Sequence, residues 1–298
     1  MKKNKKEKDY SRIALSVSRN AIIVNIVLSV FKMISGIAAN SAAMISDAVH
    51  SLSDVLSTFV VIIGVKFGAK KPDEEHQYGH ERLECVAAII LSIMLFATGL
   101  WIGYNGLIKI TLNNYEKLLV PGLLALIAAT ISIIIKEIMF WYVRNMANRI
   151  DSTALMAEAW HHRSDAFSSI GSFVGILGAR MGYPILDPIA SIVIAFFIIK
   201  AAIDIFVGAI GKMTDKACDE IVVKSIKDVI LSNKEVLAID EMKTRIFGNH
   251  IYVDVEIAID GSLTMIEAHK IAESVHEKIE KEFPKVKHCM VHVNPFKS

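Results

Sequence analysis

The chain has 298 residues, of which 53% are hydrophobic and 21% charged, and its net charge at pH 7 is only +2. A net charge this small gives no electrostatic case for nucleic-acid binding. Cys85, Cys218 and Cys289 lie far apart without CxxC spacing, which argues against a thiolate zinc site and a disulfide framework. No GxxxxGK[ST] loop is present, so no nucleotide partner is predicted.

A helix that spans a membrane needs about 20 mostly apolar residues. The third and fourth segments that meet this requirement are the cleanest, whereas the second and fifth carry His and Asp in their interiors. The six segments are Asn20–Ala38, Ala42–Phe67, Leu83–Ile108, Leu118–Tyr142, Ala154–Arg180 and Ile185–Ile210. We therefore predict an all-α, six-helix transmembrane bundle over residues 13–210, after a basic tail over residues 1–12 that we expect to be disordered.

Basic residues set the orientation of the predicted bundle. One side receives the N-terminal lysines and most of the basic residues between the spans, and the other side receives few. Because basic loops stay on the cytoplasmic side, both termini are predicted to be cytoplasmic, as an even number of spans requires. A multi-pass protein of the cell membrane is expected.

The composition changes after about residue 210, where residues 211–298 read as a soluble domain. Periodicity predicts a helix, two strands, a second helix and a last strand, which together make a small open α+β sandwich. The Gly248-Asn249 pair between the first two strands is typical of a hairpin turn. The predicted elements are Asp215–Ser232, Val236–Phe247, His250–Ile259, Leu263–Glu282 and Val286–Val293.

Two predicted spans carry the same pair of metal-ligating residue types at the same spacing. His50 and Asp54 are four residues apart in the second span, and His161 and Asp165 repeat this spacing in the fifth. Residues four apart share one helix face, roughly 6 Å apart along the axis. Two imidazoles and two carboxylates form a tetrahedral shell that suits zinc, and the two carboxylates balance the charge of a dication.

A second candidate site lies between the second and third spans. The segment from Pro72 to Arg82 reads PDEEHQYGHER, and its two histidines and several carboxylates suggest a metal site at the cytoplasmic face. A solvated polar loop is the alternative interpretation.

These motifs resemble the cation diffusion facilitator family over nearly the whole chain. The most specific parts are SDAVHSLSDV from Ser46, PDEEHQYGHERLE from Pro72 and HHRSDAFSSIGSFVG from His161. The resemblance implies a transport site of His50, Asp54, His161 and Asp165 and loop ligands Asp73, His76 and His80, with His162 a neighbour rather than a ligand. Manganese-type members tend to have Asn or Asp where His50 stands, so the zinc-type branch is expected.

The resemblance also implies a metallochaperone-like (ferredoxin-like) cytoplasmic domain that pairs two protomers and binds further metal. The matching positions are Asp240, Asp254, His269, His292 and Asn294, and surface histidines are the alternative interpretation. Zinc-type members often have His at the first two of these positions and an acid at the last, so Asp240, Asp254 and Asn294 depart from that pattern, and the Asn294 amide is a poor ligand. In the family an ion pair joins the membrane and soluble domains, and it maps onto Arg82 and Asp215.

The resulting hypothesis is a Zn²⁺/H⁺ antiporter that exports metal by alternating access, with Cd²⁺, Co²⁺, Fe²⁺ and Mn²⁺ as alternative substrates. Two other classes stay open: an intramembrane metalloenzyme and a membrane metal sensor. A catalytic zinc keeps an open coordination position and a nearby general base. Four protein ligands leave no such position, and no additional buried Glu is predicted beside them, so a non-enzymatic transporter is expected.

Overall fold

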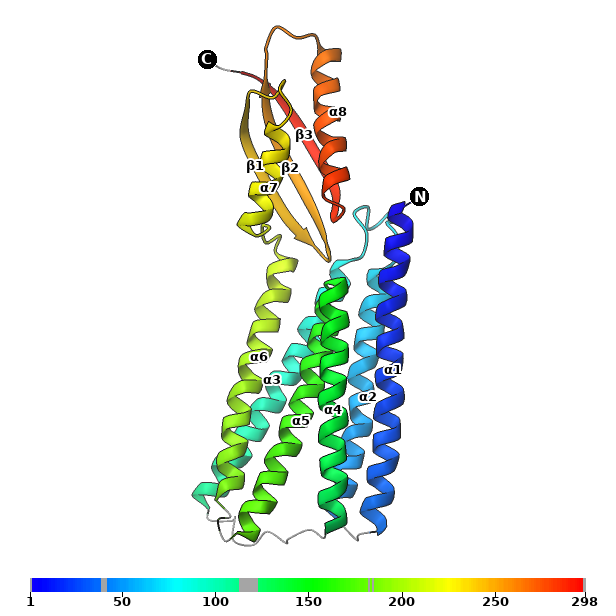
Figure 1. Ribbon diagram of the computed structural model, residues 1–298, viewed down its shortest axis with the longest axis vertical. Helices are drawn as coiled ribbons and strands as arrows, with labels where there is room; N and C mark the ends of the chain where they lie inside the picture. Colours follow the sequence, from blue (N-terminus) through cyan, green and yellow to red (C-terminus); the bar gives the residue numbers. More distant parts are fainter. Residues whose placement is uncertain (1, 39–41, 113–122, 182, 184, 297–298) are drawn as a thin grey trace. The chain divides into compact units, whose positions relative to one another are not determined.

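The computed structural model describes residues 2–38, 42–112, 123–181, 183 and 185–296. Contacts divide the chain into two compact units, Met1–Ile210 and Gly211–Ser298. The first unit is a bundle of long helices and the second a three-stranded sheet with two helices (Figure 1).

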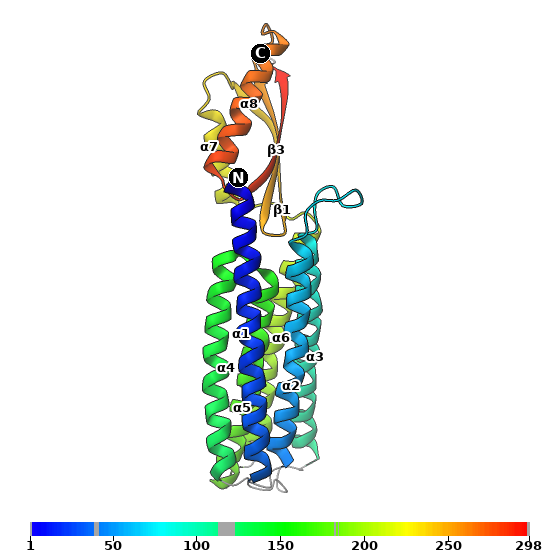
Figure 2. The same ribbon diagram turned by 90° about the vertical axis from the view of Figure 1, so that its right-hand side faces the viewer.

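In the described part of the chain, the bundle contains six long helices that lie side by side (Figure 1; Figure 2). They are α1 (Lys2–Ala38), α2 (Ala42–Gly68), α3 (Arg82–Thr111), α4 (Leu123–Ile150), α5 (Thr153–Arg180) and α6 (Leu186–Met213). Two described stretches, Arg12–Ser35 and Arg82–Thr111, are long and apolar enough to span a membrane by composition alone. Large apolar side chains such as Val27, Trp101 and Phe196 are exposed on the outside of the bundle, as a hydrocarbon solvent requires.

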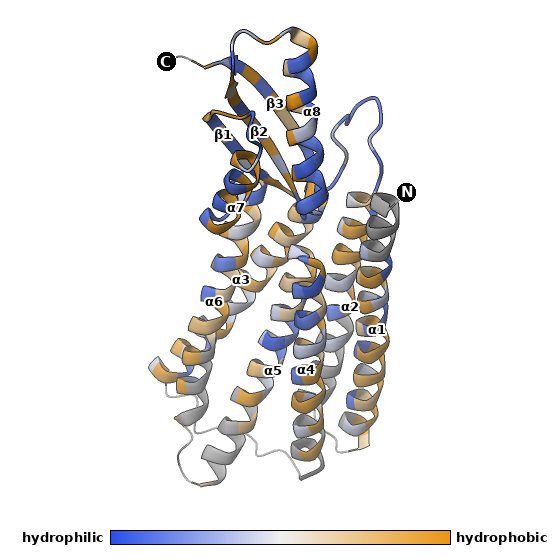
Figure 3. Cartoon of the chain, turned by 45° about the horizontal axis from the view of Figure 1, so that its top comes forward, coloured by the Kyte–Doolittle hydropathy of each residue, from blue (hydrophilic) through white to orange (hydrophobic). Residues whose placement is uncertain are grey.

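The helices pack most closely in the pairs α1 with α2 and α4 with α5, and α3 packs against both α2 and α5. Small residues allow the closest approaches. A Cβ on Gly64 of α2 would lie 2.4 Å from the Cβ of Ala87 on α3, and a Cβ on Gly99 of α3 would lie 2.8 Å from Ile199 of α6. Small residues at such crossings let backbones approach in the absence of a hydrophobic driving force between helices. Figure 3 shows hydrophilic positions within α4 and α5 among the apolar helices.

The C-terminal unit contains α7 (Glu220–Leu231), β1 (Ala238–Phe247), β2 (His250–Ile259), α8 (Met265–Glu282) and β3 (Val286–Pro295). The strand order is β1-β2-β3, with β1 antiparallel and β3 parallel to β2. Gly248, at φ 62°, opens the two-residue turn between β1 and β2, which suits a type II′ hairpin. The predicted α+β domain and its element order are confirmed.

One face of this sheet forms the core of the unit. Val253, Val255 and Ile257 of β2 alternate toward α7 and α8 and pack with Ile226 and Ile279. The intervening β2 side chains lie on the other face, where Asp254 is exposed. Of the residues predicted to bind metal in this domain, Asp254 therefore lies on the open face of the sheet, whereas His269 belongs to α8.

Several predicted boundaries differ from the structure, and two of these differences have a clear local cause. Helix α1 begins at Lys2, so the basic segment expected to be disordered is helical; its Lys and Glu residues are strong helix formers, and Gly and Pro are absent from it. Helix α7 begins at Glu220 rather than Asp215, because Asp215 has a left-handed φ of 58° and Asp219 is extended.

Candidate metal sites

Three ligand-type side chains meet in the interior of the bundle. Asp54 on α2 and His161 and Asp165 on α5 are 2%, 7% and 7% exposed, and one ligand atom from each lies within 4.8 Å of the others. His161 Nε2 is 3.5 Å from Asp54 Oδ1. Two ligands bound about 2.1 Å from one metal in a tetrahedral shell are roughly 3.4 Å apart, so this spacing fits a shared ion.

The contact between α2 and α5 brings this group together, and the four-residue spacing on α5 places His161 and Asp165 on one helix face. His50, the fourth predicted ligand, lies outside the residues whose side chains the structure describes. His162 is fully buried but does not belong to the group, and within the described residues neither of its ring nitrogens has a hydrogen-bond partner.

A lysine that was not among the predicted site residues bonds to two members of this group. Lys136 on α4 is 1% exposed, and its Nζ donates hydrogen bonds to Asp54 Oδ2 at 2.7 Å and to Asp165 Oδ2 at 2.8 Å. The interpretation of the fourth span as clean was therefore wrong. The available signal was the charge itself, because an ionisable residue inside a span marks a functional position by default.

A buried glutamate also lies near the group. Glu158 on α5 is 1% exposed, three residues before His161, and its Oε2 accepts a hydrogen bond from Ser18 of α1 at 3.1 Å. The prediction that no additional buried Glu accompanies the ligands was wrong. Helical spacing from His161 and His162 would have identified it, because residues three and four apart share a helix face.

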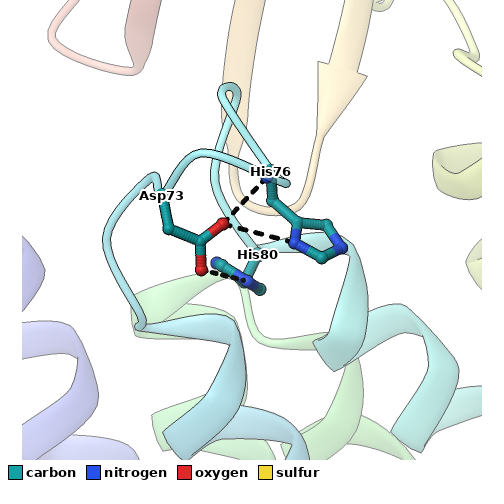
Figure 4. A group of neighbouring side chains, drawn as sticks. All are labelled: Asp73, His76 and His80. Atoms are coloured by element: carbon teal, nitrogen blue, oxygen red, sulfur yellow. Dashed lines mark hydrogen bonds and ion pairs between the residues drawn. The ribbon is translucent and has the colours of Figure 1, made fainter.

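The loop between α2 and α3 holds the second group (Figure 4). Asp73, His76 and His80 offer ligand atoms within 4.8 Å of one another, and each ring has a nitrogen 3.4 Å from an Asp73 oxygen. The Lys70 ammonium, 2.6 Å from Asp73 Oδ2, and the backbone N–H of His76 hold the pKa of Asp73 well below its usual value. The loop therefore keeps a carboxylate ionised beside two imidazoles.

The residues predicted for the cytoplasmic domain do not form such a group. Among the described residues, no three of Asp240, Asp254, His269 and His292 share a cluster within 4.8 Å. Asn294 Nδ2 instead donates to Asp240 Oδ2 at 2.9 Å and to Glu256 Oε2 at 3.1 Å. Glu256, which was not among the predicted ligands, pairs in register with His292. The alternation of β2 is the signal that places Glu256 on the same face as Asp254.

The ion pair between Arg82 and Asp215, which would join the two units, stays a prediction. Within the C-terminal unit, Asp215 Oδ2 lies 4.0 Å from Arg245 Nη1. Arg245 is therefore a second candidate partner for this carboxylate.

A bundle with an exposed apolar surface and buried carboxylate and imidazole side chains is typical of a membrane protein that handles cations. The model of the cation efflux transmembrane domain matches residues 19–213, and that of the cation efflux protein cytoplasmic domain matches residues 218–296. The chain belongs to the cation efflux family, which is the cation diffusion facilitator family expected from the motifs.

Three relatives illustrate the range of the family. An uncharacterized transporter of Methanocaldococcus jannaschii is 34% identical over 92% of this chain and 95% of its own length. The manganese efflux system protein MneP of Bacillus subtilis is 30% identical over 96% of this chain and 97% of its own. The magnetosome protein MamB of Magnetospira sp. strain QH-2 is 30% identical over 92% and 93%. A solved structure of the MamM CTD is 22% identical, covering 26% of this chain and 98% of its own at a TM-score of 0.25.

Family membership favours the transporter among the three classes that the motifs left open. The chain is a multi-pass membrane protein and a non-enzymatic divalent-cation efflux transporter.

Proposed function

We propose that the chain exports a divalent transition-metal ion, with zinc preferred, in exchange for protons by alternating access. The observation that supports this is the buried group of Asp54, His161 and Asp165, to which His50 adds a second imidazole by its spacing. Two carboxylates with imidazole nitrogens form a shell that suits zinc and neutralises a dication in a low-dielectric interior.

Proton exchange follows from the chemistry of the ligands. A ligand must be deprotonated before it binds metal, so metal and protons compete for His50, His161 and the two carboxylates. The cytoplasm-open state loads metal and releases protons, and the outward-open state takes up protons and releases metal. The absence of a nucleotide-binding loop from the sequence leaves an ion gradient as the energy source.

Metal flux into proteoliposomes tests this proposal. Asp54→Ala and Asp165→Ala should each abolish flux of zinc while the protein stays folded and inserted. A pH-sensitive dye in the same vesicles should report proton movement opposite to the metal. His162→Gln is the matched control for His161→Gln, since it changes the adjacent imidazole and should leave flux near the wild-type value. Near-normal flux in either aspartate variant would show that this group is not the transport site.

Manganese is the second candidate substrate, because two relatives from Bacillus subtilis are named manganese efflux proteins. Imidazole favours zinc, whereas oxygen ligands suit manganese. His50→Asp should therefore loosen the discrimination in favour of zinc and raise flux of cadmium or manganese relative to zinc in a competition assay. Unchanged metal ratios would show that His50 does not set the selectivity.

We further propose that both termini are cytoplasmic in the cell membrane, that the loop group of Asp73, His76 and His80 binds metal at that face, and that the protein is a homodimer. The C-terminal unit has its own hydrophobic core and matches the cation efflux cytoplasmic domain. The segment from Asp215 should therefore be a dimer whose melting temperature rises with zinc, as binding to the native state requires. A monomer indifferent to zinc would contradict both expectations for this unit.

A further inference from the structure

The ammonium group of Lys136 bonds to the two carboxylates that the transported metal would bind. Its Nζ lies 2.7 Å from Asp54 Oδ2 and 2.8 Å from Asp165 Oδ2, and the two carboxylates come from different helices. Lys136 itself comes from a third helix and is 1% exposed. The lysine is therefore a cation held between the two anionic ligands of the proposed site.

This position follows from the charges of the site. Two buried carboxylates repel each other in a medium where charges interact more strongly than in water. One ammonium offsets half of their charge and gives each carboxylate a charge-assisted hydrogen bond. Without a cation the two aspartates would be an uncompensated buried pair, which is strongly unfavourable.

A metal ion and the ammonium cannot both occupy this position. A dication that binds Asp54 and Asp165 uses the same two carboxylates that Lys136 bonds to, and it repels the ammonium at short range. Lysine has a flexible four-carbon stem, so its charge can move away while α4 stays in place. Metal binding therefore requires that the ammonium leave the carboxylates.

We propose that Lys136 is a built-in counter-ion of the transport site, a tethered cation that the metal displaces on loading and that returns on release. This inference rests on the proposed function of Asp54 and Asp165 as metal ligands. The lysine balances part of the charge of the empty site and so favours its reorientation through the bilayer. It also weakens metal affinity, because part of the binding free energy is spent on displacing the ammonium, and it thereby speeds release.

A lysine that only held α4 against α2 and α5 would behave differently. Its loss would loosen the bundle and lower the maximal rate, but it would not tighten metal binding. The two roles therefore differ in the metal concentration at half-maximal flux, which falls on loss of Lys136 only if the lysine is a counter-ion, and which is measured on the full-length protein in proteoliposomes.

The experiment uses Zn²⁺ and, separately, Mn²⁺ as the only added metals. Lys136→Met should lower the concentration at half-maximal flux at least tenfold and lower the maximal rate. Lys136→Arg, which keeps the charge, should stay within about threefold of the wild-type concentration. Arg144→Gln removes a positive charge from the same helix at a position stacked on Trp141 and Phe140, and should leave both values unchanged. Lys136→Gln, which keeps an amide donor, replaces Lys136→Met if the latter does not fold without metal.

Two results are decisive. If wild-type flux requires Asp54 but a folded Lys136→Met or Lys136→Gln binds metal no more tightly than the wild type, the counter-ion role is wrong and the transport site stands. If the wild type carries no metal, or Asp54→Ala carries it normally, the proposed function itself fails. A larger rise in melting temperature on adding Zn²⁺ to Lys136→Met than to the wild type would support the displacement.

Discussion

The carboxylate of Glu84, near the start of α3, accepts a hydrogen bond from the hydroxyl of Tyr10 on α1. It also accepts one from Ser152, in the turn between α4 and α5, and the backbone N–H of Ala154 lies 3.5 Å away. Burial and the adjacent carboxylate raise the pKa of Tyr10 above its ordinary value. A single buried side chain thus connects three parts of the bundle.

Glu84→Ala should therefore destabilise the protein by about 2 kcal/mol or more, because buried donors lose their acceptor. Glu84→Gln keeps one acceptor oxygen and should have a smaller effect, and Tyr10→Phe should cost about 1 kcal/mol. Thermal unfolding in detergent measures all three. A melting temperature for Glu84→Ala equal to that of the wild type would show that the network adds no stability.

The close approach of α2 and α3 at Gly64 gives a second prediction. An added Cβ would lie 2.4 Å from the Cβ of Ala87, so Gly64→Ala should destabilise the bundle by about 1–3 kcal/mol through overpacking. Ala87→Gly in the same chain should recover most of the loss. Gly208→Ala on α6 is the control, because among the described residues no atom outside the adjoining part of its own helix lies within 4 Å of its added Cβ, and alanine favours a helix. Equal effects of Gly64→Ala and Gly208→Ala would contradict the assigned contact.

Helix α8 begins with a capping box. The Thr264 side chain accepts a hydrogen bond from the backbone N–H of Glu267, and the Glu267 carboxylate accepts one from the backbone N–H of Thr264. Thr264→Ala should cost about 1 kcal/mol. Chemical denaturation of the C-terminal unit is the measurement, with Ser262→Ala as a neighbouring control outside the box.

The same box predicts a pH dependence. Hydrogen bonds from Thr264 lower the pKa of Glu267 in the folded unit. The stabilisation that the Glu267 carboxylate gives the folded unit is then fully present above the pKa of Glu267 in the unfolded chain, about 4.3. This stabilisation is lost as the pH falls through the lower pKa of the folded unit. The stability difference between the wild type and Glu267→Ala should shrink below about pH 4. A constant difference from pH 7 to pH 3 would exclude this linkage.

The partner of Asp215 can be identified by double-mutant cycles. Asp215 has a φ of 58°, so Asp215→Ala would combine backbone strain with loss of charge, whereas Asp215→Asn removes the charge and tolerates this conformation. We expect Asp215→Asn to couple with Arg82→Gln by more than the ~0–1 kcal/mol typical of a surface pair. The cycle with Arg245→Gln tests the partner at 4.0 Å within the C-terminal unit. Additive effects with Arg82→Gln would disprove the interdomain pair.

Local patterns predicted the C-terminal unit well. The bounds of β2 agree with the structure at both ends, because its side chains alternate strictly and Gly248-Asn249 marks the turn before it. The start of α1 was missed because the density of charge in the first residues was taken as a sign of disorder, although Lys and Glu favour helices. Periodicity and propensity thus specify elements better than net charge does.

The ligand group was predictable in part. The spacing of His161 and Asp165 is a local property of one helix, so the sequence alone identified it. The contact of Lys136 with Asp54 spans 82 residues, and a single lysine barely changes the average hydropathy of a long apolar segment. Which charge meets which carboxylate depends on how the helices pack, and one sequence gives no measure of that.

The connection between α4 and α5 is a short turn in which Asp151 has a left-handed φ of 58°. Lys136 and Asp165 thus belong to one helical hairpin, and Asp54 belongs to the neighbouring pair of α1 and α2. A cation at this point links the two helix pairs electrostatically. If metal and ammonium alternate there, the interface between the pairs contains a bridging cation in both the loaded and the empty state, so transport would exchange one bridging cation for another without leaving the two carboxylates uncompensated.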